Sequence, residues 1–326
     1  MSAAPRFSVI IPVFNRPQEI RSLLESLLHQ TVTNFEVIII EDGSTNTCAA
    51  VCEQFQDRLR LVYHSKPNSG PGPSRNVGFG LAKGEYFVVF DSDCQLPAHY
   101  FEAVTGALAI HRWDAWGGPD RGHASFTPIQ QAMAYTMSSI FTTGGIRGKR
   151  THASWFQPRS FNMGIHRRVF EKTGGFQFDR YAEDIEFSIR IRDAGFKVGL
   201  IEEAFVYHQR RENLIQFWRQ VVQFGRGRVR VGRKYPQELK WVHAFPSFFL
   251  LGVAALPVLL LFFPRTGLVA LTSLVLFWML LFFDCLRSTR SGLVAILAVA
   301  AGLVQLTGYG YGFLSALVAR KNLGGS

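Results

Sequence analysis

Three long apolar runs in the last quarter of the chain limit what it can fold into. Residues 244–263 carry no charged side chain over 20 positions, 267–286 carry only Asp284, and 292–319 are uncharged over 28 positions. Each run reaches the roughly 20 residues that a helix needs to cross a bilayer core of about 30 Å. A buried helical hairpin of a soluble domain is the alternative, but three such runs in succession are rare in soluble folds. The pattern predicts a transmembrane region over residues 241–326 with three spans.

A basic segment, residues 210–240, precedes the first of these runs. Its arginines are interleaved with apolar residues such as Leu214, Phe217 and Trp218. This pattern is typical of an amphipathic helix that lies in the membrane interface and contacts anionic lipid headgroups. An ordinary amphipathic helix packed on the preceding domain is the alternative. A nucleic-acid patch is not expected, because the basic residues adjoin a membrane span.

The distribution of charge predicts where the protein resides. The formal net charge is +11, and much of the excess lies just before the first span. The positive-inside rule therefore places that side of the span in the cytoplasm, and Arg287 and Arg290 between the second and third spans agree. No cleavable signal peptide is visible at the amino terminus. We expect a multi-pass protein of the inner or plasma membrane whose first 240 residues are cytoplasmic.

Strand and helix patterns alternate through residues 1–209. The predicted strands are 7–13, 35–40, 59–63, 86–90, 115–119, 197–201 and 204–207. The predicted helices are 17–29, 48–55, 74–82, 97–110, 128–141 and 183–194. This alternation is typical of an α/β domain with a mostly parallel sheet flanked by helices. Ligands of such sheets bind beyond the carboxyl ends of the strands.

Two groups of acidic residues lie at positions suited to chemistry. Asp91-Ser92-Asp93 directly follow the predicted strand 86–90, and Glu183-Asp184 open the predicted helix 183–194. Carboxylate oxygens are the ligands that hard divalent cations prefer. An acidic pair downstream of a metal-type acidic motif suggests metal-assisted transfer of a sugar from a nucleotide.

An ordered set of motifs resembles the family 2 inverting glycosyltransferases of the GT-A fold. The motifs are Val9–Asn15, Glu41–Ser44, Ser74–Gly78, Asp91–Asp93, Asn162–Ile165, Gly174–Phe176 and Glu183–Phe187. The likeness covers about residues 5–210. The order of the motifs carries it, because any single motif alone is a weak signal. It implies a GT-A catalytic domain over residues 1–209 with a mixed, mostly parallel sheet.

The resemblance implies a nucleotide-sugar site. Its expected residues are Pro12, Phe14, Asn15, Asp42, Arg75, Asp91 and Ser92. Asp42 would bond the nucleobase, Arg75 would reach base or phosphate, and Asp91 would meet the ribose. The alternatives are a plain Asp-Gly turn for Asp42 and a surface arginine for Arg75. Pro12 and Phe14 would shape the base pocket or simply pack.

The resemblance also implies a divalent metal, Mg²⁺ or Mn²⁺, that neutralises the leaving diphosphate. Asp93 would hold the metal, with Asp91 as a second ligand and His208 as a third. A structural histidine at a strand end is the alternative for His208. The donor would be a UDP- or GDP-linked sugar.

Inversion requires a base that takes the proton of the acceptor hydroxyl. Asp184 is the expected base and Glu183 the second choice, and a helix N-cap is the alternative role for either. The helix dipole would lower the basicity of Asp184, so positioning is expected to contribute strongly. Asn162 is expected on the acceptor side.

These expectations favour a membrane-anchored inverting hexosyltransferase that moves one sugar to a hydroxyl of a lipid-linked glycan at the cytoplasmic leaflet. A polyprenyl-phosphate glycosyl synthase, which transfers the sugar to a lipid phosphate, is the alternative, because the stretch Asp91–Pro97 also resembles those enzymes. A membrane scaffold that has lost activity is a third interpretation. Polymer synthesis is disfavoured, since Gln216–Arg219 does not match the Gln-x-x-Arg-Trp motif of processive members.

Overall fold

The structure is a computed structural model that describes residues 4–121, 126–143, 156–208 and 211–319. The chain forms two compact units. The first comprises residues 1–123 and 154–209, and the second comprises residues 124–153 and 210–326. The chain therefore leaves the first unit, returns to it and leaves it again. The predicted domain boundaries at 209 and 240 stay predictions.

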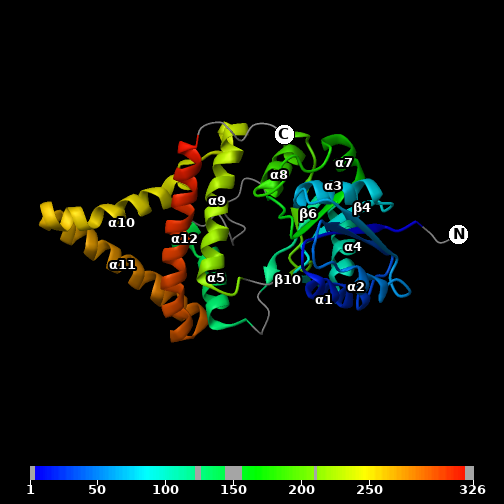
Figure 1. Cartoon of the computed structure of the whole chain (residues 1–326), viewed down its shortest axis with the longest axis horizontal. Helices are drawn as coiled ribbons and strands as arrows, with labels where there is room; N and C mark the ends of the chain where they lie inside the picture. The colour runs from blue at the N-terminus through cyan, green and yellow to red at the C-terminus, as the bar shows by residue number, and fades with distance from the viewer. Residues whose placement is uncertain (1–3, 122–125, 144–155, 209–210, 320–326) are drawn as a thin grey trace. The chain divides into compact units, whose positions relative to one another are not determined.

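A seven-stranded sheet forms the centre of the first unit (Figure 1). Its strands, in spatial order, are β3 (Leu61–Lys66), β2 (Phe35–Asp42), β1 (Phe7–Val13), β4 (Tyr86–Phe90), β8 (Asn162–His166), β6 (Ala115–Gly117) and β9 (Val198–Leu200). The strands β3, β2, β1 and β4 are parallel, and β8 runs antiparallel to both of its neighbours. The sheet is therefore mixed and mostly parallel.

Helices flank this sheet and share two hydrophobic clusters with it. They are α1 (Pro17–Leu28), α2 (Ala49–Glu53), α3 (Pro71–Leu81), α4 (Tyr100–His111), α7 (Arg167–Thr173) and α8 (Glu183–Asp193). Val9 and Ile11 of β1 belong to the cluster that contains α1, α2 and α4 residues. Ile10 belongs to the cluster of α3, α7 and α8. Because successive side chains of a strand point to opposite faces, the two clusters lie on the two faces of the sheet. The predicted fold class is confirmed.

The central strands are buried along their whole length. All seven residues of β1 and all eight residues of β2 are buried. Strands covered on both faces carry continuous apolar runs, which is why these two were predictable from sequence. Each fully buried Ile, Val or Phe contributes about 1.5–3 kcal/mol relative to an exposed one. This burial holds the strand ends, and the loops that follow them, in fixed positions.

The strand β8 was not expected from the sequence. It contributes only five residues, and Gly164 lies at its centre. A Cβ atom on Gly164 would lie 2.0 Å from the indole ring of Trp116, a fully buried residue of β6. Glycine therefore lets the Trp116 ring cover the strand. So short a segment with a central glycine carries no periodic pattern.

A second, three-stranded sheet lies at the end of β4. It is formed by β5 (Cys94–Gln95), β10 (Val206–His208) and β7 (Asp120–Arg121) in that order, β10 being central. Cys94 pairs with His208 in antiparallel register. This small sheet ties the residue after Asp93 to a strand more than a hundred residues later in the chain.

The second unit is helical. Its helices are α5 (Pro128–Ser138), α6 (Ile140–Thr143), α9 (Leu214–Lys234), α10 (Phe245–Phe262), α11 (Pro264–Thr289) and α12 (Gly292–Val318), with short 3₁₀ turns at Pro236–Glu238 and Trp241–Ala244. Within the described residues, three segments are long and apolar enough to cross a membrane: Trp241–Phe262, Pro264–Thr289 and Gly292–Val318. The three long apolar helices at the carboxyl end are thus confirmed.

The basic helix α9 packs along α12. Gly225 of α9 lies so close to α12 that an added Cβ would be 2.2 Å from the carbonyl oxygen of Tyr309. From the other side, a Cβ on Gly312 would be 2.1 Å from the carbonyl oxygen of Val222. Arg233 at the end of α9 donates to the carbonyl oxygen of Ala316 at 2.5 Å. The sequence suggested that this segment lies in the membrane interface or packs on the preceding domain. Its packing on one of the long apolar helices was not expected.

The helix α5 also packs on α12. Thr127 caps α5, because its side chain accepts from the Gln130 backbone amide at 3.4 Å. Ala132 of α5 is fully buried in one cluster with Ala295 and Ala298 of α12. The helix predicted over 128–141 is present as α5 but ends at Ser138, where Ser139 is extended, and its apolar face belongs to the helical unit.

Candidate active site

The carboxyl ends of β1, β2 and β4 carry most of the residues expected to bind the donor. These strands are parallel and adjacent, so Asp42, which ends β2, and Asn15 and Asp91, which follow β1 and β4, lie at one edge of the sheet. The helix α3 and the start of α8 supply Arg75 and Glu183, which bond to each other, and Arg75 also bonds Asp91 at this edge. The structure thus brings together side chains from five segments of the chain.

Arg75 is the centre of this arrangement. Its side chain is 3% exposed, and Nη1 donates to Glu183 Oε1 at 2.9 Å while Nη2 donates to Asp91 Oδ1 at 2.7 Å. Its guanidinium lies 5.2 Å from the ring centre of Phe176. The Nε of Arg75 is buried without a hydrogen-bond partner. Arg75 therefore joins the acidic motif after β4 to the acidic pair that opens α8.

Glu183 is held in a buried position. Its residue is 8% exposed, and Oε1 also accepts from the Ser160 hydroxyl at 3.2 Å. Burial and the neighbouring charge of Asp184 raise the pKa of the Glu183 carboxyl, and the attraction of Arg75 offsets only part of that shift. Because Glu183 already bonds Arg75 and Ser160, its carboxylate is part of the hydrogen-bond network that holds the site together.

Asp184 has a different environment from its neighbour. Its side chain is 16% exposed, Oδ2 lies 3.5 Å from Arg159 Nη1, and Oδ1 accepts from the Ile185 amide at 2.8 Å. Among the described residues, Arg159 is the cation that pairs with it, and only at 3.5 Å. Of the two acidic side chains, that of Asp184 is the more exposed, at 16% against 10% for Glu183.

The backbone turn before α8 orients the acidic pair Glu183 and Asp184. Tyr181 and Ala182 both have positive φ angles, of 56° and 61°. Left-handed backbone costs a residue with a side chain about 1–2 kcal/mol. Two such residues in succession persist only where the surroundings impose them, and they are typical of functional sites.

Asp93 is paired with an arginine that the sequence did not single out. Arg16, the residue before α1, has its Nη1 2.5 Å from Asp93 Oδ2. The Asp93 side chain is 8% exposed and that of Arg16 is 34% exposed. The only signal for Arg16 in the sequence is its position after Asn15. Its partner lies 77 residues away, which no local pattern reveals.

Asp42 closes the loop between β3 and α3. Its carboxylate accepts from the Ser69 and Gly70 amides, each at 2.9 Å, and from Lys66. Burial alone would raise the pKa of Asp42, but these hydrogen bonds outweigh it and hold the pKa below its ordinary value. The Ser74 side chain also lowers the pKa of this carboxyl group, and the residue is only 3% exposed.

The loop after β1 is fixed by Asn15. This residue has a left-handed φ of 56°, and its Oδ1 accepts from the Thr45 and Asn46 amides at 2.9 Å each. Phe14 is 49% exposed at the strand end, whereas Pro12 is buried within β1. Phe14 is therefore the one of the two that can contact a ligand directly, and Pro12 can act only through packing.

The other residues expected in the site are Ser92, Asn162 and His208. Ser92 is 6% exposed within the acidic motif. Asn162 is fully buried, with Oδ1 accepting from the Tyr100 hydroxyl at 2.6 Å and Nδ2 donating to the Ala204 carbonyl at 2.8 Å. Both ends of the Asn162 amide are therefore occupied, and it positions the end of β8. The backbone of His208 pairs with Cys94 beside Asp93, and its side chain lies outside the described part.

A divalent metal fits the donor set at this edge. Among the described residues no group of three or more His, Cys, Asp or Glu side chains converges on one point. Magnesium is commonly held by one or two carboxylates together with substrate phosphates and water. Asp93 and Asp91 provide such a pair, with their oxygens presently bonded to Arg16 and Arg75.

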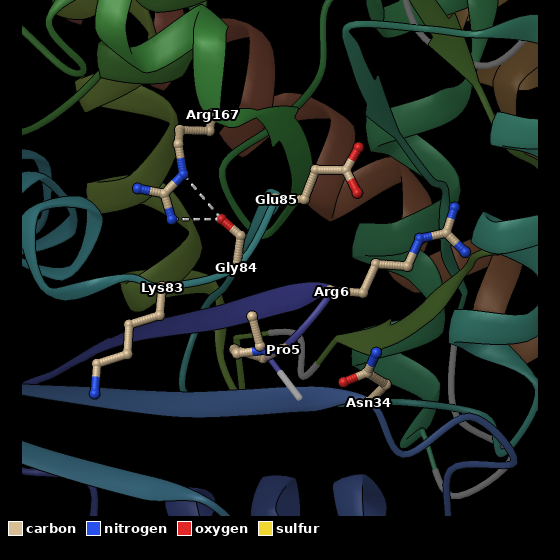
Figure 2. Close-up of a pocket in the computed structure, with 8 residues that line it drawn as sticks. Pro5, Arg6, Asn34, Lys83, Gly84, Glu85 and Arg167 are labelled. Atoms are coloured by element: carbon tan, nitrogen blue, oxygen red, sulfur yellow. Dashed lines mark hydrogen bonds between the residues drawn. The ribbon is translucent and has the colours of Figure 1, made fainter. Parts of the chain in front are cut away.

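A cavity of about 470 Å³ lies at the opposite end of the same strands (Figure 2). It is lined by Ala4, Pro5, Arg6, Asn34, Lys83, Gly84, Glu85 and Arg167. At its lining, Arg167 donates to the Gly84 carbonyl at 2.7 Å (Figure 2). None of the residues expected to bind the donor lines it. The cavity therefore does not belong to the candidate active site.

Comparison with known proteins gives a consistent result. The model of the family described as "Glycosyl transferase family 2" matches residues 8–174. A protein described as the probable glycosyltransferase YdaM of Bacillus subtilis is 27% identical over 250 residues, which are 72% of this chain and 58% of that protein. The glycosyltransferase GlyG of Streptococcus pneumoniae is 36% identical over 88 residues, 26% of this chain and 29% of that protein. The chain thus spans less than two thirds of the length of these relatives.

Solved structures share the fold. A mannosyltransferase from Pyrobaculum calidifontis, in complex with GDP-Man and Mn²⁺, has a TM-score of 0.65 at 17% identity, covering 93% of this chain and 88% of its own. Staphylococcus aureus TarS, residues 1–349, in complex with UDP-GlcNAc, has a TM-score of 0.50 at 21% identity, covering 69% and 66%. At these identities the likeness concerns the fold.

Proposed function

The chain belongs to glycosyl transferase family 2, and from this we propose that it transfers a single sugar, with inversion, from a nucleotide-sugar to a hydroxyl of a lipid-linked glycan at the cytoplasmic leaflet. One observation carries the proposal. Asp91, Arg75 and Glu183 form a single ion-pair network at the carboxyl edge of the sheet, with Arg75 buried at its centre, and Asp184 lies next to Glu183 with a side chain that is 16% exposed.

Asp184 is proposed as the general base. An inverting transfer needs one carboxylate to accept the proton of the attacking hydroxyl. The backbone turn before α8 and the bond from the Ile185 amide fix where this carboxylate lies. Glu183 keeps the base in place through Arg75, since a rigid neighbour limits movement of the helix start.

Asp93 and Asp91 are proposed to hold a divalent cation, Mg²⁺ or Mn²⁺, together with the donor diphosphate. When bound, such a cation stabilises the negative charge of the leaving nucleoside diphosphate. The chain's own contribution is to hold the two carboxylates at a fixed strand end and to bring them to the donor. A structural neighbour that binds GDP-Man with Mn²⁺ supports a metal in this fold.

The donor is proposed to be a UDP- or GDP-linked sugar, because structural neighbours bind donors of each kind. Asp42, at the end of β2, is proposed to bond the nucleobase, and Phe14 exposes its ring at the same edge.

The acceptor is proposed to be lipid-linked because the chain carries its own apolar helices. Three helices of 22, 26 and 27 residues are apolar enough to span a bilayer. An enzyme anchored in this way meets substrates in the plane of the membrane, where their local concentration is high. Positive charge before the first span supports a cytoplasmic catalytic unit in the inner or plasma membrane.

Nucleotide release by the full chain in detergent tests this function. The assay uses a panel of UDP- and GDP-sugars, with membrane lipid extract, and with Mn²⁺, Mg²⁺ or chelator. We expect metal-dependent turnover of one donor that is lost in Asp93→Ala and Asp184→Ala. Turnover with a polyprenyl phosphate that survives Asp184→Ala would instead favour transfer to a lipid phosphate. Failure of every donor to bind or turn over would refute the transferase.

A further inference from the structure

The two acidic ligands expected for the metal are each bonded to a different arginine. Asp91 is bonded to Arg75, and Asp93 is bonded to Arg16. The two arginines differ in how firmly they are held. Arg75 has a side chain that is 3% exposed and two carboxylate partners, whereas the Arg16 side chain is 34% exposed and bonds Asp93.

The backbone at Arg16 is fixed, although its side chain is not enclosed. Asn15 anchors the preceding position through the Thr45 and Asn46 amides. Pro17 follows and begins α1, which restricts the backbone on the other side. The Arg16 guanidinium can therefore change partners by side-chain rotation alone, while its Cα stays at the sheet edge.

Arg16 and a metal ion compete for the same carboxylate. The Arg16 contact is to Asp93 Oδ2 at 2.5 Å, and a bound magnesium would lie about 2.0–2.1 Å from a ligand oxygen. Two cations placed so close together repel each other strongly at a buried site. The arrival of a metal at Asp93 therefore weakens the bond to Arg16.

The donor supplies the displaced arginine with a new partner. A nucleotide-sugar diphosphate carries several anionic oxygens, of which the metal binds only some. A guanidinium binds phosphate oxygens through paired, charge-assisted hydrogen bonds. An arginine anchored beside Asp93 is well placed to take those that the metal leaves free.

We propose that Arg16 is a displaceable cap on Asp93, which holds the carboxylate in the absence of metal and passes to the diphosphate when metal and nucleotide bind. This inference rests on the proposed function, because it uses the metal and the nucleotide as ligands. It gives Arg16 two opposite effects. Arg16 weakens the binding of metal alone and strengthens the binding of metal together with nucleotide.

Manganese binding measures both effects without catalysis. Free Mn²⁺ is counted by electron paramagnetic resonance during titration of the full chain in detergent, first alone and then with UDP or GDP. The variant Arg16→Ala removes the cap. Arg21→Ala removes a positive charge from α1, the helix that follows Arg16, and serves as the matched control. Asp93→Asn identifies which Mn²⁺ signal comes from this site.

We expect Arg16→Ala to bind Mn²⁺ alone about fivefold more tightly than the wild type, as loss of a partly exposed competing ion pair implies. In the presence of Mn²⁺ the same variant should bind the nucleotide diphosphate on the order of tenfold more weakly. Arg21→Ala should leave both affinities unchanged. Arg16→Lys should restore part of the competition, but little of the paired phosphate contact.

The outcomes separate the cap from the proposed function. Mn²⁺ affinity that is lost in Asp93→Asn but unchanged or weakened in Arg16→Ala would overturn the cap and leave the metal site intact. Absence of Mn²⁺ binding in wild type and Arg16→Ala alike, with and without nucleotide, would overturn both. Nucleotide binding that is insensitive to chelator but lost in Arg16→Ala would show that Arg16 acts in place of a metal, which also contradicts the cap.

Discussion

Nη1 of Arg75 lies 2.9 Å from Oε1 of Glu183, and both side chains are buried. The two residues are 108 positions apart in the sequence. One stands on α3 and the other opens α8, so this contact joins two helices that lie far apart in the sequence.

Removal of Arg75 should destabilise the protein. Arg75→Gln leaves Glu183 buried beside Asp184 with its main compensating charge gone, and breaking a buried pair in this way costs about 3–5 kcal/mol. Thermal unfolding of the full chain in detergent should show a clear fall in the melting temperature. The double variant Arg75→Gln with Glu183→Gln removes both charges and should recover part of the loss. A double variant less stable than Arg75→Gln alone would contradict the pairing.

Stability should depend on pH through Glu183. The pKa of Glu183 is raised in the folded protein above its ordinary value of 4.5. Above that pH the unfolded chain ionises first and the folded chain retains its proton, so the free energy of unfolding falls as pH rises through the folded pKa. The melting temperature of the wild type should therefore decline with rising pH more steeply than that of Glu183→Gln. Parallel pH profiles would show that Glu183 titrates normally.

The titration of Asp42 should change the stability in the direction opposite to that of Glu183, and at lower pH. Its pKa is held below the ordinary value of 3.8, so its stabilising effect is present above that pH and is lost as pH falls through the folded pKa. Asp42→Asn should flatten the acid side of the stability profile, leaving the Glu183 region unchanged. The measurement is the same thermal series extended to acid pH.

Replacement of Asp184 should affect turnover more than folding. Asp184→Asn keeps the size and the bond to the Ile185 amide but removes the base, so kcat should fall about 10²–10⁴-fold while the donor KM changes little. Its melting temperature should stay near that of the wild type, because Asp184 bonds Arg159 only at 3.5 Å. An unchanged kcat would remove Asp184 as the base.

The contact between α9 and α12 should tolerate no side chain at Gly225. A Cβ there would lie 2.2 Å from a backbone oxygen of α12, and overpacking of this kind costs about 1–3 kcal/mol. Gly225→Ala should lower the melting temperature in detergent. Gly252→Ala on α10 is the matched control, because a Cβ at Gly252 meets nothing within 4 Å. Equal effects of the two substitutions would argue against close packing of α9 on α12.

The fold was predictable from sequence wherever an element carries its own pattern. The strands β1 and β4 begin and end where the sequence predicted, because a buried strand is a continuous apolar run. The three apolar helices were predictable for a similar reason, since length and absence of charge decide them. The strand β8 was missed because it is set by its neighbours, with Gly164 leaving space for the Trp116 ring.

The candidate site was predictable as a set of residues but not as a set of contacts. Motif resemblance pointed to Asp91, Asp93 and Arg75, and their roles stay predictions. The pairing of Arg16 with Asp93 depends on two loops that meet only in the folded sheet. The burial of Asn162 likewise depends on Tyr100 and on the backbone of Ala204. Such partners are separated widely in sequence, and a local pattern contains no information about them.

The placement of α5 has a consequence for synthesis of the protein. The apolar face of α5 is covered by α12, which begins at Gly292, about 150 residues after α5 ends at Ser138. At roughly 5–20 residues per second, a ribosome needs on the order of 10–30 s to make the intervening chain. During that interval the apolar face of the nascent helix lacks its α12 cover, although Met133 meets its α9 partners Phe217 and Val221 earlier. The membrane surface or a chaperone must shield it until the last helix emerges, so a chain ended before Gly292 should be prone to aggregate.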